Sequence, residues 1–231
     1  MSLTVATIVK NEANRFLPSA LRAWTQFADR IVVLDDGSTD GTGDLCREAG
    51  CEVHRQNPPL MFGNEWKARR ILWRLAAEKA DWVLHLDADQ VTSCDPKPFL
   101  KEPGSAFKVY DLWGPDEYRE DAWWTGHLRA WWPAVHVPSL PNDFKDEWPL
   151  RGWHSGHVPL NVPGPMHPVE GCAILHYAYS TPELREHKAK MYKDLGPHLT
   201  GPEQAHAKSI LFKARTKPLP FTPEWRLELG R

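Results

Sequence analysis

The first ninety residues alternate between short apolar runs and longer segments of helical periodicity, and this alternation limits the folds open to the chain. Four runs are rich in β-branched and apolar residues, as buried strands are: Leu3–Val9, Ile31–Leu34, Cys51–His54 and Trp82–Leu86. Segments with apolar residues at helical spacing separate them, the third at Glu65–Lys79. This order predicts an α/β fold with a mostly parallel sheet covered by helices on both faces.

Acidic residues follow two of the predicted strands. Asp35 and Asp36 come after the second strand, and Asp87 and Asp89 after the fourth. Because parallel strands present their carboxyl ends at one edge, where ligands bind in such sheets, we expect all four acids along that edge. Side chains two residues apart on an extended chain point to the same side, so Asp87 and Asp89 are expected to face one ligand.

Two neighbouring carboxylates repel each other unless a cation lies near them. Oxygen ligands suit Mg²⁺ or Mn²⁺, which also binds phosphate oxygens, so the pair predicts a metal that holds a diphosphate. The alternative is a solvated loop in which Asp89 caps a helix. The position directly after a buried strand favours the metal site. A carboxylate such as Asp36 also suits an N–H donor of a nucleobase such as uracil.

Composition excludes some classes of protein. The chain has 231 residues, enough to bury a core, and a formal net charge of −2, so nothing demands a polyanionic partner. Its four cysteines have no zinc-ribbon spacing and favour a reducing compartment. The start resembles no signal peptide, and no apolar segment approaches the ~18 residues of a membrane span. We therefore expect a cytoplasmic protein without a transmembrane segment.

The chain changes character near residue 100, where tryptophan becomes frequent. Seven of its twelve tryptophans are Trp113, Trp123, Trp124, Trp131, Trp132, Trp148 and Trp153. Each can be explained as core, but as a cluster they predict an aromatic-rich acceptor-side subdomain. A further helix is expected at Thr181–Tyr192, with a proline at its first position. The tail from Lys217 is predicted to be either a loose extension or a strap across the fold.

Three stretches, TIVKNEANRFLPSAL, ADRIVVLDDGSTDGT and ADWVLHLDADQV, together resemble the family 2 glycosyltransferases, which have the GT-A fold. The subgroup that includes lipopolysaccharide-core glucosyltransferases is the most similar. The resemblance covers residues 3–91 and continues more weakly through HLRAWW and AILHYAYSTPELREHKAKMY. It implies a single GT-A domain with a Rossmann-like sheet. Residues 1–100 would be the nucleotide-sugar-binding half, and residues 101–231 the acceptor-side half with its C-terminal helix and extension.

The resemblance also implies a donor, a metal and their ligands. The donor would be a nucleotide-sugar, expected to be a UDP-sugar, and the metal Mn²⁺ or Mg²⁺. The expected donor-binding residues are Ile8, Lys10, Glu12, Asp36, Arg69, Asp87, Ala88 and Arg129. The expected metal ligands are Asp89 and Asp87, with His176 at the metal or the diphosphate. For His176 the alternative, a core histidine at a strand end, stays open.

Members of this family transfer with inversion, which implies a single displacement assisted by one general base. The base normally comes from a His-Glu or Glu-Asp element in the second half. The matching stretch here is DEWPLRGWHSGH, where a serine follows His154 and the expected glutamate is absent. Glu147 and His154 are therefore the first candidates, and Asp121 the third.

Other functions remain open at this point. A nucleotidyltransferase would need a glycine-rich loop after the first strand, and TIVKNEANRF is not glycine-rich. A catalytically degenerate nucleotide-binding module is consistent with the missing His-Glu pair but not with the intact acids. The tryptophans and arginines would also suit a nucleic-acid-base-modifying glycosyltransferase, against which the near-neutral charge argues. The acceptor thus stays open among a glycan, a lipid-linked sugar, a protein, a small metabolite and a nucleic-acid base.

Overall fold

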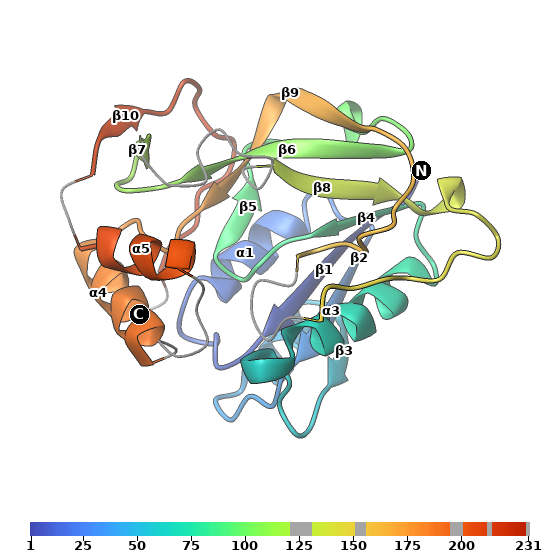
Figure 1. Cartoon of the computed structure of the whole chain (residues 1–231), viewed down its shortest axis with the longest axis horizontal. Helices are drawn as coiled ribbons and strands as arrows, with labels where there is room; N and C mark the ends of the chain where they lie inside the picture. Colours follow the sequence, from blue (N-terminus) through green and yellow to red (C-terminus); the bar gives the residue numbers. More distant parts are fainter. Residues whose placement is uncertain (121–130, 151–155, 195–200, 212–213, 230–231) are drawn as a thin grey trace.

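The computed structural model describes the chain except residues 121–130, 151–155, 195–200, 212–213 and 230–231 (Figure 1). Its main sheet has the strand order β3-β2-β1-β4-β8-β6-β9-β5, and β7 and β10 form a small second sheet. The strands of the main sheet are β1 Leu3–Val9, β2 Arg30–Asp35, β3 Glu52–Arg55, β4 Trp82–His85, β5 Gln90–Thr92, β6 Gly104–Asp111, β8 Trp131–His136 and β9 Met166–His176. The second sheet pairs β7 Glu117–Arg119 with β10 Thr216–Pro218. The helices are α1 Leu17–Trp24, α2 Thr42–Glu48, α3 Met61–Ala77, α4 Pro182–Asp194 and α5 Gly201–Ser209, with short 3₁₀ turns at Lys97–Phe99 and Val137–Ser139.

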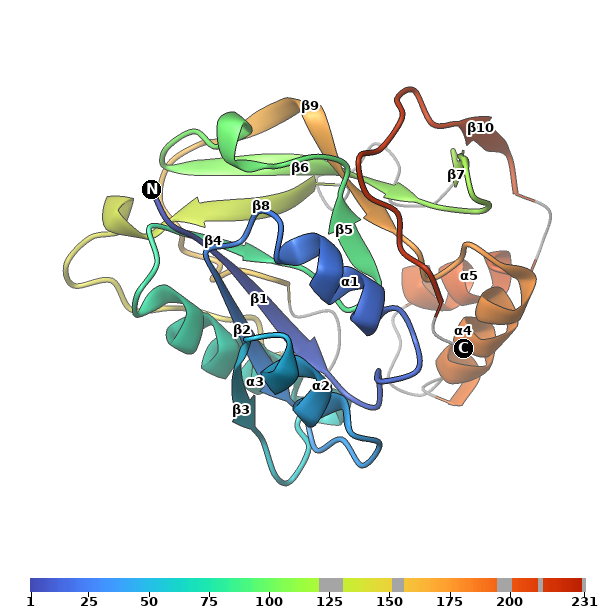
Figure 2. The same cartoon turned by 180° about the vertical axis from the view of Figure 1, so that it is seen from behind.

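The predicted α/β fold is confirmed. Strands β3, β2, β1 and β4 are parallel neighbours, and α1 and α2 cover one face of them while α3 covers the other (Figures 1 and 2). β1 and most of β2 are buried, which explains why their sequences are apolar without alternation. The third helix begins at Met61, four residues before the predicted start. Its first turn is stabilised by Asp36, which accepts hydrogen bonds from the N–H groups of Leu60 and Met61.

The second half of the sheet determines where the acids lie. β4 pairs antiparallel with β8, whereas β5 lies at the far edge, next to β9. The chain therefore crosses from the centre of the sheet to its edge within residues 86–89. Gln90 of β5 is the partner of His176 in β9, and the Tyr177 N–H donates to the Asp89 carbonyl at 2.9 Å. This crossing brings the end of β9 to the turn that carries Asp87 and Asp89, here called the acidic turn.

The tail is a strap, the second of the two predicted alternatives. The Glu224 N–H donates to the Ser93 carbonyl at 2.7 Å, and the Glu228 N–H donates to Ser19 Oγ at 3.0 Å. Leu227 between them is 7% exposed and joins the core on the α1 side. Figure 2 shows this segment, in dark red, crossing the face that carries α1.

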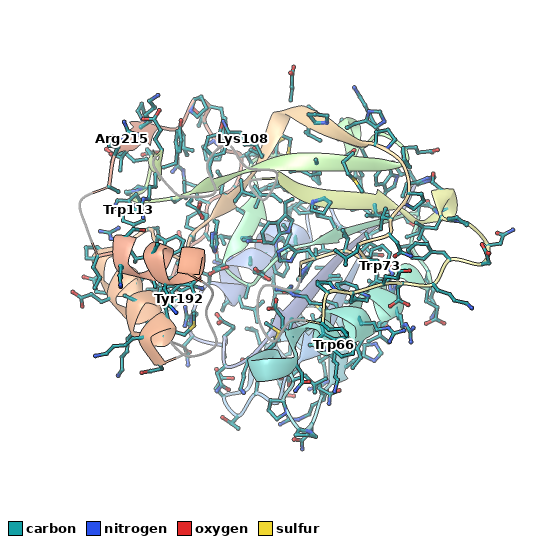
Figure 3. The ribbon with its side chains drawn as sticks, viewed as in Figure 1. Trp66, Trp73, Lys108, Trp113, Tyr192 and Arg215 are labelled. Carbon is teal, nitrogen blue, oxygen red and sulfur yellow. The ribbon has the colours of Figure 1, made fainter. Side chains whose placement is uncertain are left out.

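The described tryptophans are distributed among different packing clusters. Trp132 packs against the core on the α1 side, Trp148 lies in the core on the α3 side, and Trp113 packs with Tyr179 and Tyr192 near α4 (Figure 3). Three tryptophans of the sequence cluster, Trp123, Trp124 and Trp153, lie outside the described residues. A separate aromatic subdomain thus stays a prediction. No helix in the described ranges is long and apolar enough to cross a membrane.

Candidate active site

The loop after β1 is held by the DDGSTDGT segment that follows β2. Ser38 Oγ accepts a hydrogen bond from the Asn11 N–H at 3.0 Å. Thr42 Oγ1 accepts from the N–H groups of Glu12 and Ala13 at 2.8 and 3.0 Å. The hydroxyl residues of this segment thus position the backbone of the loop at the carboxyl end of the sheet.

Asp35 and Asp36 are both fully buried at the end of β2. Asp35 Oδ1 accepts from the Ser38 N–H at 2.8 Å, so this acid shapes the turn. The two oxygens of Asp36 accept from the Leu60 and Met61 N–H groups at 2.6 and 3.1 Å. Among the residues predicted to line the nucleoside pocket, Ile8 is buried in β1, and Lys10 and Glu12 are half-buried directly after it.

The two aspartates after β4 lie in a turn, which corrects the expectation of an extended chain. The Gln90 N–H donates to the Asp87 carbonyl at 2.9 Å, and the Asp87 N–H donates to Gln90 Oε1 at 3.0 Å. Gln90 and Ala88 are both buried, so the turn packs against the protein interior on one side. The side chains of Asp87 and Asp89 remain 33% and 17% exposed, respectively. The turn forms because the chain leaves the centre of the sheet here for its edge.

Arg69 lies against the first of these acids. Its Nη1 is 3.3 Å from Asp87 Oδ1 and 2.9 Å from His85 Nδ1, and its Nε donates to Glu65 Oε1 at 3.0 Å. Burial raises the pKa of Asp87 and Asp89 adds to this, while Arg69 opposes it. Burial and the Arg69 charge hold the pKa of His85 well below its usual range. Arg69 therefore forms an ion pair with Asp87, the first acid of the turn.

One group of possible metal ligands lies around this arginine. Within the described part of the chain, His85, Asp87 and His157 offer ligand atoms within 4.8 Å of one another. His157 also stacks on Trp132, with ring centroids 3.6 Å apart. Since the Arg69 guanidinium already contacts His85 Nδ1 and Asp87 Oδ1, a second cation held between His85, Asp87 and His157 would be repelled. This cluster is better explained as the support of Arg69.

A second group surrounds Asp89. His176 Nε2 lies 3.6 Å from Asp89 Oδ1, and His176 Nδ1 lies 2.6 Å from Asp111 Oδ1. Burial acts to lower the pKa of His176, but Asp89 and Asp111 outweigh it and raise the pKa to about 10. The pKa of Asp89 is held well below its usual range, because His176, Lys188 and Arg15 outweigh burial. The structure thus places His176 beside Asp89, and the metal role of this pair stays a prediction.

Two cationic side chains, Arg15 of the loop after β1 and Lys188 of α4, lie near Asp89. Arg15 has its Nε 3.4 Å from Glu12 Oε2 and its Nη1 3.4 Å from His187 Nε2, so the loop after β1 contacts α4. Lys188 follows on α4 and is half-buried. Burial acts to lower its pKa, but Tyr192, Asp89 and Asp87 outweigh burial and raise it. Positive charge from Arg15 and Lys188 therefore collects around Asp89.

Of the three predicted catalytic residues, the structure describes only Glu147. Glu147 is exposed, and its N–H donates to Asn161 Oδ1 at 3.0 Å. His154, Asp121 and the predicted donor residue Arg129 lie outside the described residues. The identity of the general base therefore stays a prediction.

Several residues around these acids are not predicted from the sequence. Asp111 ends a strand as Asp87 nearly does, so the same pattern of an acid after an apolar run signals it. Glu65 lies four residues before Arg69, a spacing that allows an ion pair on a helix. For Arg15 and Lys188 we find no sequence signal, since each is one basic residue among many.

Comparison with protein-family models matches residues 4–97 to the model described as "Glycosyl transferase family 2". This segment contains β1 to β4 and both aspartates of the turn, Asp87 and Asp89. It is the part of the chain in which the resemblance to this family is carried by the sequence motifs.

Curated relatives match different parts of the chain. A TPR repeat-containing protein of Synechococcus elongatus is 33% identical over 88 residues, which are 38% of this chain and 20% of that protein. An uncharacterized protein of Mycobacterium tuberculosis is 26% identical over 211 residues, covering 81% of this chain and 49% of the relative. The chain thus spans between a fifth and half of the length of these relatives.

Among solved structures, S. aureus TarS has a similar fold. Its match has a TM-score of 0.56 at 15% identity and covers 91% of this chain and 42% of that one. A shorter TarS structure gives a TM-score of 0.55 at 16% identity, covering 91% of this chain and 70% of that one. The family match and the shared fold support the predicted enzyme class, that of glycosyltransferases. Residues 4–97 therefore match the family 2 glycosyltransferase model, and the described chain has the GT-A fold.

Proposed function

We propose that this protein transfers a sugar from a nucleotide-sugar, in the first instance a UDP-sugar, to an acceptor hydroxyl with inversion. The observation that carries the proposal is the meeting of Asp89 and His176 beside Asp87, at the carboxyl ends of the parallel strands. In a sheet of this kind that edge is the place for a nucleotide. TarS, whose fold this chain shares, forms complexes with UDP and with UDP-GlcNAc.

The donor would bind across the ends of β1, β2 and β4. Ile8, Lys10 and Glu12 would line the nucleoside pocket, with Ala88 below it. Both oxygens of Asp36 already accept backbone hydrogen bonds, and a carboxylate oxygen has further lone pairs with which to accept from a uracil N–H. Residues 1–100 would thus bind the donor, and residues 101–231 would face the acceptor.

Asp89, Asp87 and His176 would hold a divalent cation. The donor set fits such an ion, because the Asp89 carboxylate and the His176 imidazole lie 3.6 Å apart and Asp111 binds the other imidazole nitrogen. Mg²⁺ prefers oxygen ligands alone, so the histidine favours Mn²⁺. When bound, the cation would neutralise the charge that develops on the departing diphosphate.

Side chains of the chain itself would do the remaining work. Lys188 and Arg15 would hold the diphosphate from the rim, as cations beside a phosphate do. A base would take the proton of the attacking hydroxyl, and Glu147, His154 and Asp121 stay the candidates. Arg129 would lie near the diphosphate or the acceptor.

We also propose, on the sequence resemblance alone, membership of the subgroup with lipopolysaccharide-core glucosyltransferases and a cytoplasmic location. The acceptor stays open.

The test is a calorimetric titration of the purified chain with UDP, GDP and dTDP, each in Mn²⁺ and then in EDTA. We expect micromolar binding of UDP that weakens at least tenfold in EDTA. In Asp89→Ala the Mn²⁺-dependent part should disappear, because one ligand of the cation is lost. Asp44→Ala, a change at an exposed acid of α2, is the matched control and should leave binding unchanged.

Each alternative outcome has a meaning. Binding of GDP or dTDP instead of UDP would correct the nucleotide but keep the enzyme class. Unchanged Mn²⁺-dependent binding in Asp89→Ala would refute the metal assignment. No binding of any nucleotide would contradict the proposed function and leave a GT-A fold without donor.

A further inference from the structure

We propose that Asp111 is a positioning residue that orients His176 for the metal ion. The inference rests on the proposed metal site and adds a residue to it. Asp111 would not touch the metal itself. It would act through the imidazole, by binding the nitrogen that faces away from Asp89.

The sheet places Asp111 and His176 next to each other. β6 and β9 run parallel, and their paired positions at the carboxyl ends are Asp111 and His176. The Leu112 N–H donates to the His176 carbonyl at 2.9 Å, so the backbones are fixed at this point. Asp111 is only 5% exposed, and its Oδ1 is 2.6 Å from His176 Nδ1. The contact is therefore short, buried and supported by the sheet register.

The contact determines which imidazole nitrogen is available. A carboxylate is an acceptor, so Nδ1 carries the hydrogen and donates it to Asp111. In the neutral imidazole that metals bind, Nε2 then has the free lone pair, and Nε2 is the nitrogen beside Asp89. Carboxylates that hold a ligating histidine in this way fix its tautomer and its ring orientation.

The ring of His176 is held on further sides. Tyr179 meets it edge to face, with ring centroids 5.4 Å apart. On the other strand, Gln90 is the sheet partner of His176, and the Tyr177 N–H donates to the Asp89 carbonyl. Asp89 and His176 are thus locked together by backbone pairing, and Asp111 supplies the remaining restraint, the rotation of the imidazole.

The experiment measures Mn²⁺ affinity of the full chain without nucleotide, by calorimetry and by paramagnetic resonance of free Mn²⁺. We expect Asp111→Ala to lower the affinity by about 10- to 100-fold, the usual loss when such a partner is removed. Asp111→Asn keeps an oxygen acceptor of the same shape without the charge, so a smaller loss is expected. Binding of UDP in EDTA should be unchanged in both variants.

A second readout separates positioning from general stability. In ¹⁵N-histidine NMR spectra the wild type should show a strongly hydrogen-bonded proton on Nδ1 of His176, and Asp111→Ala should lose this signature. Glu52→Ala is the matched control, because it removes a carboxylate 2.8 Å from the imidazole of His54 in β3, at the edge of the same sheet opposite β5. Its Mn²⁺ affinity should equal that of the wild type.

The outcomes distinguish this inference from the proposed function. Wild-type Mn²⁺ affinity in both Asp111 variants, together with its loss in Asp89→Ala, would overturn the role of Asp111 and leave the metal site standing. No Mn²⁺ binding by the wild type would overturn both. If Asp111→Ala does not fold, a weakened affinity in folded Asp111→Asn supports the inference, and an unchanged affinity refutes it.

Discussion

At the scale of single residues, Glu12 makes the stability of the protein depend on pH. Burial raises its pKa from 4.5 to about 7, with Arg15 opposing and Asp89 adding to the shift. Its side chain is 18% exposed. Because the folded state favours the protonated acid, the stability associated with Glu12 is fully present below pH 4.5 and is lost as the pH rises through about 7.

We therefore expect Glu12→Gln to gain stability relative to the wild type as the pH rises, by about 2 kcal/mol between pH 5 and pH 8. Urea unfolding in EDTA at the two pH values measures this difference. Glu48→Gln, at an exposed position of α2, should show none. If the stability difference between Glu12→Gln and the wild type is equal at both pH values, the raised pKa of Glu12 is contradicted.

At the scale of elements, α4 brings Lys188 to the turn that carries Asp87 and Asp89. The helix begins at Pro182, and the Leu184 N–H donates to Thr181 Oγ1 at 3.3 Å, which agrees with the predicted start. Lys188 and Lys190 are two residues apart on it, so they point in different directions. Lys188 is half-buried beside Asp89, whereas Lys190 is exposed.

This pair of lysines provides a matched test of the proposed contact between Lys188 and the diphosphate. Loss of a charge-assisted hydrogen bond costs about 1.5–3 kcal/mol, so Lys188→Gln should weaken UDP binding about tenfold or more. Lys190→Gln should bind UDP as the wild type does. Titration with UDP and with uridine measures both, and uridine binding should not change in either variant. Equal loss for UDP and uridine in Lys188→Gln would indicate damage to the helix instead.

At the scale of the whole molecule, the C-terminal strap joins distant parts of the chain. Its backbone is bonded to Ser93 after β5 and to Ser19 in α1, and Trp225 packs against Phe27 with ring centroids 5.3 Å apart. Leu227 is 7% exposed, while Leu229, two residues on, is 46% exposed. The strap therefore contributes to the hydrophobic core, and it does so through a few side chains.

Truncating a buried leucine to alanine usually costs about 2–5 kcal/mol, and we expect about 2 kcal/mol for Leu227→Ala because it lies at the edge of the core. Leu229→Ala should cost close to nothing. Denaturant unfolding of the two variants checks this. Equal midpoints for both would show that the strap does not belong to the cooperative fold.

The sequence by itself determined the parallel half of the sheet. Apolar runs and helical spacing are local patterns, and the boundaries that they predict for β1 and β2 differ from the structure by at most one residue. The position of Asp36, Asp87 and Asp89 at one edge also follows from sequence, because the carboxyl ends of parallel strands necessarily lie together.

Only the tertiary structure decided how these acids are neutralised. Asp89 meets His176 and His176 meets Asp111 because β5 lies beside β9 at the edge of the sheet, and β9 beside β6. The Asp111–His176 contact joins residues 65 apart in the chain, and the Arg69–Asp87 contact depends on how α3 packs on β4. Such contacts depend on strand order and packing, which are properties of the whole chain and leave no local pattern in the sequence.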